Sequence, residues 1–281
     1  MGRAPGRVYF PGDVPAHRPV PGGCPSSTFG RQALSVTGTP TRFFLLQVRN
    51  PDDPMLHQEV RCFARSFRCD VGQIEVFDLL SGPPGRDALD RADVVLLGGS
   101  GDYSVARGGP WLAGALDAMV ALHEEDKPTF ASCWGFQAMA RALGGEVVTD
   151  RGRAEVGTVW LELTEEGRRD PVFGLLDERF QVLIGHEDIV TELPRGATLL
   201  ASSDRVENEA FRFDGKPIYC TQFHPELCRA DIVQRLAAYP SYLPLANATS
   251  LEEFERMMPE TPHAEAILRR FLDLVMAPTS R

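Results

Sequence analysis

The chain has 281 residues, of which 43% are hydrophobic, and it carries a formal net charge of −10 at pH 7. This length and this apolar share suffice for a globular fold with a sizeable core. The acidic balance excludes nucleic acid as an expected partner, since binding to the phosphate backbone needs a surplus of Lys and Arg. The six cysteines show neither a C-x-x-C pair nor a zinc-ligand spacing, and no P-loop pattern occurs. We therefore expect no metal and no cofactor.

Residues 1–40 are rich in Pro, Gly and Arg and have no sustained period of 2 or 3.6. This composition predicts a flexible N-terminal leader. The leader lacks the apolar region of a secretory signal, and no segment of the chain approaches the ~18 apolar residues of a membrane helix. We therefore expect a cytoplasmic protein that has no membrane partner.

The pattern changes at Arg42, where Phe43–Val48 is a continuous apolar run typical of a strand buried on both faces. Helical and strand patterns then alternate. They predict helices at Leu56–Arg68 and Trp111–His123 and strands at Ile74–Phe77, Val94–Leu97 and Thr129–Ser132. Such alternation implies right-handed crossovers and a parallel sheet. The expected fold class is α/β, with a doubly wound, mostly parallel sheet and helices on both faces.

The second half of the chain is richer in strand patterns. They lie at Gly157–Leu163, Gln181–Ile184, Thr198–Ala201, Ala210–Phe213 and Pro217–Phe223. After Pro240 come a capping-box signature at Ser250 and an amphipathic segment at Ala264–Val275, which predict helical cover for the sheet. We therefore divide the chain into the leader 1–40, a main domain 41–240, and a C-terminal helical extension 241–281 that packs on the same domain.

Cys133 lies between the predicted strand Thr129–Ser132 and a helical segment that begins at Trp134. A sharp strand-to-helix turn lifts a side chain out of the sheet at its carboxyl edge, and a helix N-terminus favours a thiolate. Gly135 provides the small residue needed after such a turn, and Ala131 stands where Gly is more usual. The motif predicts a nucleophile, with a buried structural thiol as the alternative.

His224 and Glu226 flank Pro225 at the end of the predicted strand Pro217–Phe223. On a strand, residues i and i+2 point to one face, so Glu226 can orient one imidazole nitrogen while the other faces Cys133. Attack on an amide also needs N–H donors for the oxyanion, and the N–H of Trp134 is one by position. These are the parts of a cysteine acyl-transfer site.

The sequence resembles the class I (triad) glutamine amidotransferases, in particular stand-alone proteins similar to the glutaminase domain of GMP synthetase. The resemblance runs from about Arg42 to about Cys228, about two thirds of the chain. Its motifs occur in the order of the family: Gly98-Gly99-Ser100-Gly101, the Cys133 segment with Gln137, Glu155-Val156-Gly157, Gly185-His186-Glu187-Asp188, and His224-Pro225-Glu226. Domain 41–240 is thus expected to be a flavodoxin-like amidotransferase domain.

The resemblance also implies roles for residues of the glycine turn and the pocket. It assigns the second oxyanion donor to the N–H of Gly99, and it makes Gln137 a contact of bound glutamine with Gly101 beside it. Asp188 is expected to bind the substrate ammonium. Two positions depart from the family pattern: Ser100 stands where Pro is usual, and Gly185 stands where Ser or Asn is common. These departures leave open whether the oxyanion hole is formed before a substrate or partner arrives.

The activity implied by the resemblance is that of a glutaminase. Cys133 would attack the side-chain amide of glutamine, His224 would protonate the departing ammonia, and a γ-glutamyl thioester would be hydrolysed to glutamate. Ammonia would pass to a separate synthetase partner, or the enzyme would act on another γ-glutamyl compound. Two alternatives stay open, a γ-glutamyl peptidase or hydrolase and a non-catalytic regulatory or binding protein, and the intact Cys133, His224 and Glu226 argue against the second.

Overall fold

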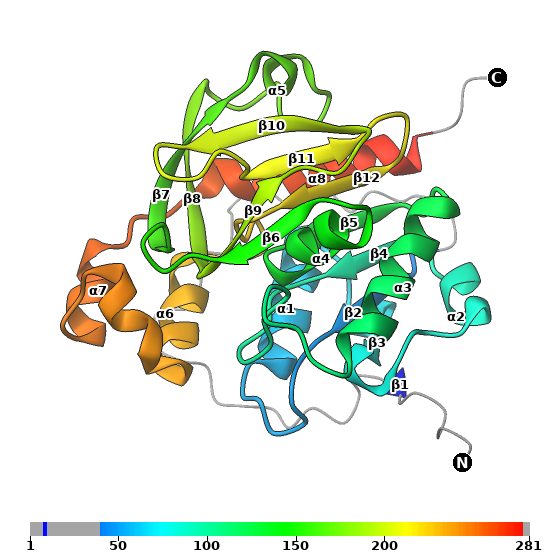
Figure 1. Cartoon of the computed structure of the whole chain (residues 1–281), viewed down its shortest axis with the longest axis horizontal. Helices are drawn as coiled ribbons and strands as arrows, with labels where there is room; N and C mark the ends of the chain where they lie inside the picture. Colours follow the sequence, from blue (N-terminus) through cyan, green and yellow to red (C-terminus); the bar gives the residue numbers. More distant parts are fainter. Residues whose placement is uncertain (1–7, 10–39, 278–281) are drawn as a thin grey trace.

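The computed structural model describes residues 8–9 and 40–277. Their main feature is a mixed ten-stranded sheet with the strand order β1-β3-β2-β4-β5-β12-β11-β10-β7-β8 (Figure 1). Most of the predicted leader 1–40 lies outside the described residues. Its described part, β1 (Val8–Tyr9), pairs antiparallel with β3 at the sheet edge.

The centre of the sheet is parallel. Its strands are β3 (Ile74–Asp78), β2 (Phe43–Gln47), β4 (Val94–Leu97), β5 (Thr129–Ser132) and β12 (Ile218–Thr221). Every residue of β2, β4, β5 and β12 is buried, as expected for parallel strands covered on both faces. The predicted α/β fold class with a doubly wound sheet is confirmed.

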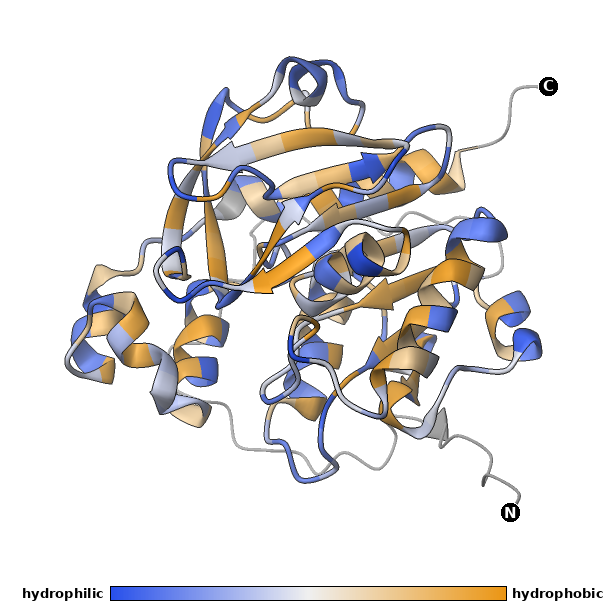
Figure 2. Cartoon of the chain, viewed as in Figure 1, coloured by the Kyte–Doolittle hydropathy of each residue, from blue (hydrophilic) through white to orange (hydrophobic). Residues whose placement is uncertain are grey.

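Helices cover both faces because successive strand residues point to opposite sides. Phe43 and Leu45 of β2 pack on the face of α1 (Leu56–Phe67) and α8 (Pro262–Met276). Phe44 and Leu46 pack on the opposite face. That face is covered by α2 (Arg86–Arg91), α3 (Leu112–Glu124) and α4 (Trp134–Ala142). Figure 2 shows hydrophobic segments along these strands.

The second half extends the sheet with antiparallel strands. These are β7 (Glu155–Leu163), β8 (Arg179–His186), β10 (Ala197–Ser203) and β11 (Ala210–Phe213), with α5 (Glu165–Arg169) beside them. The predicted strands of this half are confirmed, with ends that match or are shifted by one or two residues. Two strands were missed: β6 (Glu146–Thr149) and β9 (Asp188–Glu192) form a separate small sheet.

The chain after β12 forms α6 (Arg229–Ala238), a 3-10 turn at Pro240–Ala246, and α7 (Leu251–Met257) before α8. Ser250 caps the N-terminus of α7: its hydroxyl accepts a hydrogen bond from the Glu253 N–H, as the capping signature predicts. Phe271 of α8 packs on Phe130 with ring centroids 5.3 Å apart. The division at residues 240 and 241 stays a prediction, although these contacts agree with an extension packed on the sheet.

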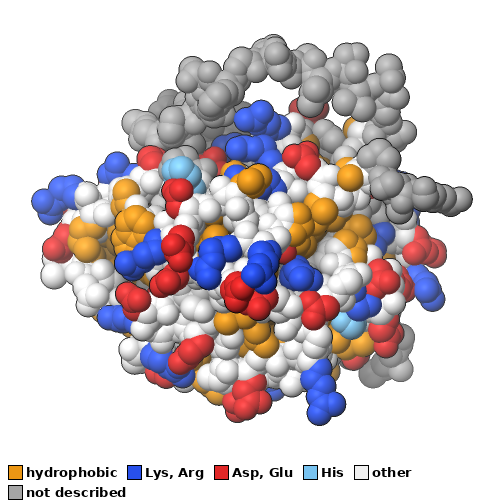
Figure 3. Space-filling model, turned by 90° about the horizontal axis from the view of Figure 1, so that it is seen from above, with side chains coloured by type: hydrophobic (Ala, Val, Ile, Leu, Met, Phe, Trp, Pro, Cys, Tyr) orange, Lys and Arg blue, Asp and Glu red, His pale blue; other side chains and the backbone are white. Residues whose placement is uncertain are grey.

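Two surface properties bear on partners. Basic and acidic side chains are interspersed on the face seen in Figure 3, which is not the one-sign surface of a phosphate-binding protein. Among the described residues, no helix has the length and apolar character needed to span a bilayer.

Candidate active site

Cys133 lies on a strained turn between β5 and α4. Its backbone has φ 52° and ψ −103°, a region that residues other than Gly rarely occupy. The turn is held on both sides: the Cys133 N–H donates to the Thr221 carbonyl at 2.8 Å, and the Gly135 N–H donates to the Gly98 carbonyl at 3.2 Å. The expected strand-to-helix elbow is therefore present in the fold.

Gly135 is required by a close approach of β4 to α4. A Cβ atom at this position would lie 2.5 Å from the Leu97 Cβ and 3.2 Å from the Ala131 Cβ. Ala131 itself is fully buried, and its methyl group is part of the core on the face of α3 and α4. The methyl group at the position where Gly is more usual is accommodated.

His224 and Glu226 are brought together at a distance of 2.6 Å between Nδ1 and Oε1, and both side chains are buried. The prediction that they lie on a strand is wrong, because β12 ends at Thr221. The chain then turns, and the His224 N–H donates to the Leu183 carbonyl of β8. The turn still brings the imidazole into the same pocket as Cys133, whose thiol donates to the Gly185 carbonyl at 3.8 Å.

Burial and charge act in opposite directions on this pair. Burial alone would lower the pKa of His224, but Glu226 and Cys133 outweigh it and raise that pKa to about 9. Burial would raise the pKa of Glu226, but His224 and then Arg235 hold it below its ordinary value. The arrangement favours an imidazolium beside an ionised carboxylate.

The two expected oxyanion donors differ in this structure. The Trp134 N–H lies in the first turn of α4, where N–H groups have no partner within the helix. The Gly99 N–H, in contrast, donates to the Glu59 carboxylate at 3.1 Å. The role of Gly99 as an oxyanion donor stays a prediction. The turn lies beside the site, because a Cβ on Gly99 would lie 3.0 Å from the His224 ring, but in this structure the Gly99 N–H is already bonded to Glu59.

Glu59 was not predicted from the sequence, although its carboxylate binds the backbone of the glycine turn. Its side chain is fully buried on α1 and binds the Arg49 guanidinium, with Nη2 to Oε1 at 3.0 Å. Gln47 also donates to it at 2.9 Å. No sequence motif marks it, since a lone Glu on a helix is ordinarily exposed.

Two of the expected substrate residues are engaged with the protein. The Asp188 carboxylate accepts hydrogen bonds from the Ser104 hydroxyl at 2.6 Å, the Thr149 hydroxyl at 2.6 Å and the Ala106 N–H at 3.1 Å. The Gln137 amide nitrogen donates to the Asp188 carbonyl at 3.0 Å. The expected ammonium-binding role of Asp188 is therefore not supported by its contacts, which brace the loop after the glycine turn.

Two adjoining pockets open beside Cys133. Gly101, Gln137 and Asp188 line the first, and His224 and Gly99 line the second. Tyr242, from the turn Pro240–Ala246, lines both pockets. It was not predicted, since it lies outside every motif. Gly101 packs against Tyr239, whose ring would lie 2.6 Å from a Cβ at this position.

One buried cluster offers metal-type ligand atoms. Those of Glu155, His186 and Glu209 lie within 4.8 Å of one another, and all three side chains are buried. Burial first, and then Glu155, raise the pKa of Glu209 well above its ordinary value. Among the described residues, neither Glu209 carboxylate oxygen has a hydrogen-bond partner, and the raised pKa favours the neutral acid at this position.

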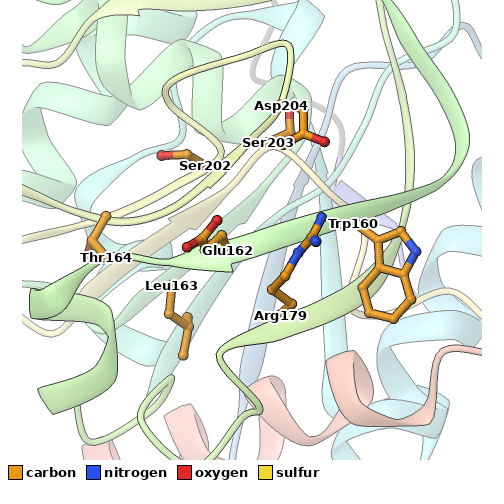
Figure 4. Close-up of a pocket in the computed structure, with 8 residues that line it drawn as sticks. All are labelled: Trp160, Glu162, Leu163, Thr164, Arg179, Ser202, Ser203 and Asp204. Carbon is orange, nitrogen blue, oxygen red and sulfur yellow. The ribbon is translucent and has the colours of Figure 1, made fainter.

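A further hollow lies away from Cys133 on the antiparallel strands (Figure 4). Its lining residues are Trp160, Glu162, Leu163, Thr164, Arg179, Ser202, Ser203 and Asp204. Arg179 stacks over the Trp160 ring at 5.9 Å. This hollow has neither a cysteine nor a histidine, so the candidate active site is the one at Cys133.

The fold and the Cys133 turn define an α/β protein with a nucleophile-type elbow above a parallel sheet. The chain belongs to the Glutamine amidotransferase class-I family, whose sequence profile matches residues 64–231.

Relatives include a glutamine-hydrolyzing GMP synthase component from Archaeoglobus fulgidus, with 36% identity over 129 residues, covering 45% of this chain and 67% of that protein. The glutamine-hydrolyzing GMP synthase of Thermotoga maritima is 30% identical over 174 residues, 62% of this chain. This match spans 32% of the Thermotoga protein, so the chain corresponds to about a third of that relative.

Solved structures have the same fold. A glutamine amidotransferase from Thermotoga maritima has a TM-score of 0.64 at 22% identity, covering 85% of this chain and 99% of that one. A glutamine amido transferase from Methylobacillus flagellatus has a TM-score of 0.61 at 17% identity, covering 83% and 94%. These likenesses concern the fold.

Proposed function

We propose that the chain is a glutaminase that hydrolyses the side-chain amide of glutamine through a γ-glutamyl thioester on Cys133. The observation that carries this proposal is the strained Cys133 elbow facing an imidazole that is bonded at 2.6 Å to a buried carboxylate. A nucleophile, a base and an orienting group in this order are what acyl transfer needs.

In this mechanism the Cys133 sulfur attacks the amide carbon, and the N–H of Trp134 donates to the oxyanion. The C–N bond then breaks, and the His224 imidazolium gives its proton to the departing ammonia. Water next attacks the thioester carbon and loses a proton to His224, and the C–S bond breaks to restore the thiolate. The net reaction converts glutamine and water to glutamate and ammonia.

The partner that we propose is a separate synthetase protein that receives the ammonia. This rests on relatives that are named as one component of GMP synthase and not as the whole enzyme. A γ-glutamyl peptidase is the second candidate. It is favoured by Gly185. This residue has no side chain to hold glutamine, and it leaves open space beside Cys133 that a larger γ-glutamyl substrate could fill.

Ammonia released from glutamine, measured beside glutamate released from γ-glutamyl peptides, separates these candidates. Activity on glutamine that is lost in Cys133→Ala supports the glutaminase. Activity confined to γ-glutamyl peptides supports the peptidase, and activity in neither assay, also with added cell extract, supports a non-catalytic protein.

A further inference from the structure

Arg235 of α6 lies behind the proposed catalytic pair, beyond the segment that the family profile matches. Its side chain is buried, and its Nη1 lies 3.3 Å from the Nδ1 of His224. Its Nη2 lies 3.9 Å from the Oε1 of Glu226. The same nitrogen lies 3.9 Å from the Oε1 of Glu59. One guanidinium therefore stands between the orienting carboxylate and the carboxylate that binds the glycine turn.

The contact between Arg235 and His224 is not an ordinary hydrogen bond. At 2.6 Å from an ionised Glu226, Nδ1 must carry a proton, and a protonated nitrogen cannot accept from a guanidinium. The interaction is therefore a charge placed near the ring. It stabilises the ionised Glu226 and opposes the positive charge of the imidazolium.

A hydrogen bond from the guanidinium to α1 fixes the position of Arg235. Its Nε donates to the Gln58 amide oxygen at 2.9 Å, and Gln58 lies on α1 next to Glu59. Within the described part of the chain, its Nη2 has no acceptor at hydrogen-bonding distance, so that nitrogen is held by the two carboxylates on either side. A buried guanidinium nitrogen without a hydrogen bond is costly unless opposite charge lies nearby, and these two carboxylates supply it.

We propose that Arg235 is a positioning residue. It aligns Glu226 with His224, opposes the positive charge of the His224 imidazolium, and connects this pair through Glu59 to the Gly99 turn. This inference rests on the proposed glutaminase function for its kinetic consequence. Its electrostatic part stands on the contacts alone.

The groups that act on the His224 ring are Glu226, Cys133 and Arg235. Arg235 is the one among them that disfavours the imidazolium, so its removal should let His224 keep its proton to higher pH. The Glu226 carboxylate would also lose a neighbouring cation, and its alignment would relax. Because a misplacement of about 1 Å can cost about a hundredfold in rate, we expect a shift of about half that size to lower kcat about tenfold.

The test compares Arg235→Gln with Arg229→Gln. Arg229 is a matched control, because it lies on the same helix and carries the same charge, but it donates to the Glu255 carbonyl. The first readout is an NMR titration of the His224 ring, which does not need turnover. The second is the kcat and KM for glutamine.

We expect Arg235→Gln to move the His224 titration up by about one pH unit. We also expect its kcat to fall about tenfold while KM stays within about twofold, since Arg235 makes no contact of the kind that binds substrate. Arg229→Gln should match the wild type in both readouts. A folded Arg235→Gln that titrates and turns over like the wild type would overturn the inference.

Arg235→Lys covers the case in which Arg235→Gln does not fold. It keeps one positive charge but cannot reach Gln58 and both carboxylates together. Its titration and kcat should lie between those of the wild type and Arg235→Gln, and wild-type values in both would overturn the inference. Absence of glutaminase activity in the wild type would contradict the proposed function but not the inference about Arg235, because the His224 titration would still test that inference.

Discussion

Replacement of Glu226 by Gln is the sharpest test of the proposed mechanism. The change keeps the size of the side chain but removes the charge that lies 2.6 Å from the Nδ1 of His224. Burial pulls the pKa of His224 down, and Glu226 is the largest of the influences that raise it from 6.5 to about 9. At ~1.4 kcal/mol per pKa unit, a rise of this size corresponds to about 3 kcal/mol of imidazolium stabilisation.

If most of this stabilisation is lost, kcat for glutamine should fall about a hundredfold. The loss should be smaller than that of Cys133→Ala, because Glu226 forms no covalent bond with substrate. Ammonia release under saturating glutamine measures the effect. Glu166→Gln on the exposed side of α5 is the control, with the same chemical change at a distant site.

Two results would refute this reasoning. A loss of less than about threefold in kcat would mean that Glu226 does not support the imidazolium. A folded Glu226→Gln as inactive as Cys133→Ala would require a larger role for Glu226 than orientation.

Three more outcomes follow from the structure. Cys133 should be the most rapidly alkylated of the described free thiols at neutral pH, since burial raises the pKa of the other three. Glutamine should slow this labelling. Preferential labelling of another cysteine, detected by mass spectrometry, would contradict the prediction. Glu209→Gln should raise Tm relative to the wild type, and the rise should be larger at pH 8 than at pH 5. The reason is that folding raises the pKa of this carboxyl, so its burial costs more stability as the pH rises above the unfolded value of ~4.3. An equal rise in Tm at both pH values would count against a protonated Glu209. The isolated protein should turn over glutamine about a hundredfold more slowly than a site with both oxyanion donors in place, because the Gly99 N–H is held by Glu59. A synthetase partner should raise kcat more than it lowers KM. A high kcat that cell extract does not change would exclude this prediction.

The sequence predicts those features that lie in contiguous segments. Val94–Leu97 and Thr129–Ser132 match β4 and β5 at both ends. Val94–Leu97 is an uninterrupted apolar run, and Thr129–Ser132 is a short buried segment that is ended by the Cys133 turn. The Cys133 elbow is found for the same reason, since its strand, turn and helix are adjacent. Strands β6 and β9 were missed because each has only two consecutive apolar residues, Val147-Val148 and Ile189-Val190.

Features set by tertiary contacts could not be predicted from local patterns. Glu59 meets Gly99 from a helix 40 positions earlier, and Arg235 meets Gln58 from 177 positions later. The expectation that His224 and Glu226 continue the strand was wrong because β12 ends at Thr221 and the chain turns toward β8, where the Leu183 carbonyl accepts from the His224 N–H. Such partners become visible only when the fold brings distant segments together.

The two sides of the proposed oxyanion hole are held by different kinds of bond. The Cys133 turn is fastened through its backbone to Thr221 and Gly98, whereas the Gly99 N–H is held by one carboxylate side chain. Backbone bonds to a buried sheet fix the Cys133 turn, whereas the Gly99 N–H depends on a carboxylate that is itself held by Arg49 and Gln47. If a synthetase partner raises kcat, as predicted above, we expect it to act on this buried group of residues around Glu59 and to leave the Cys133 turn unchanged.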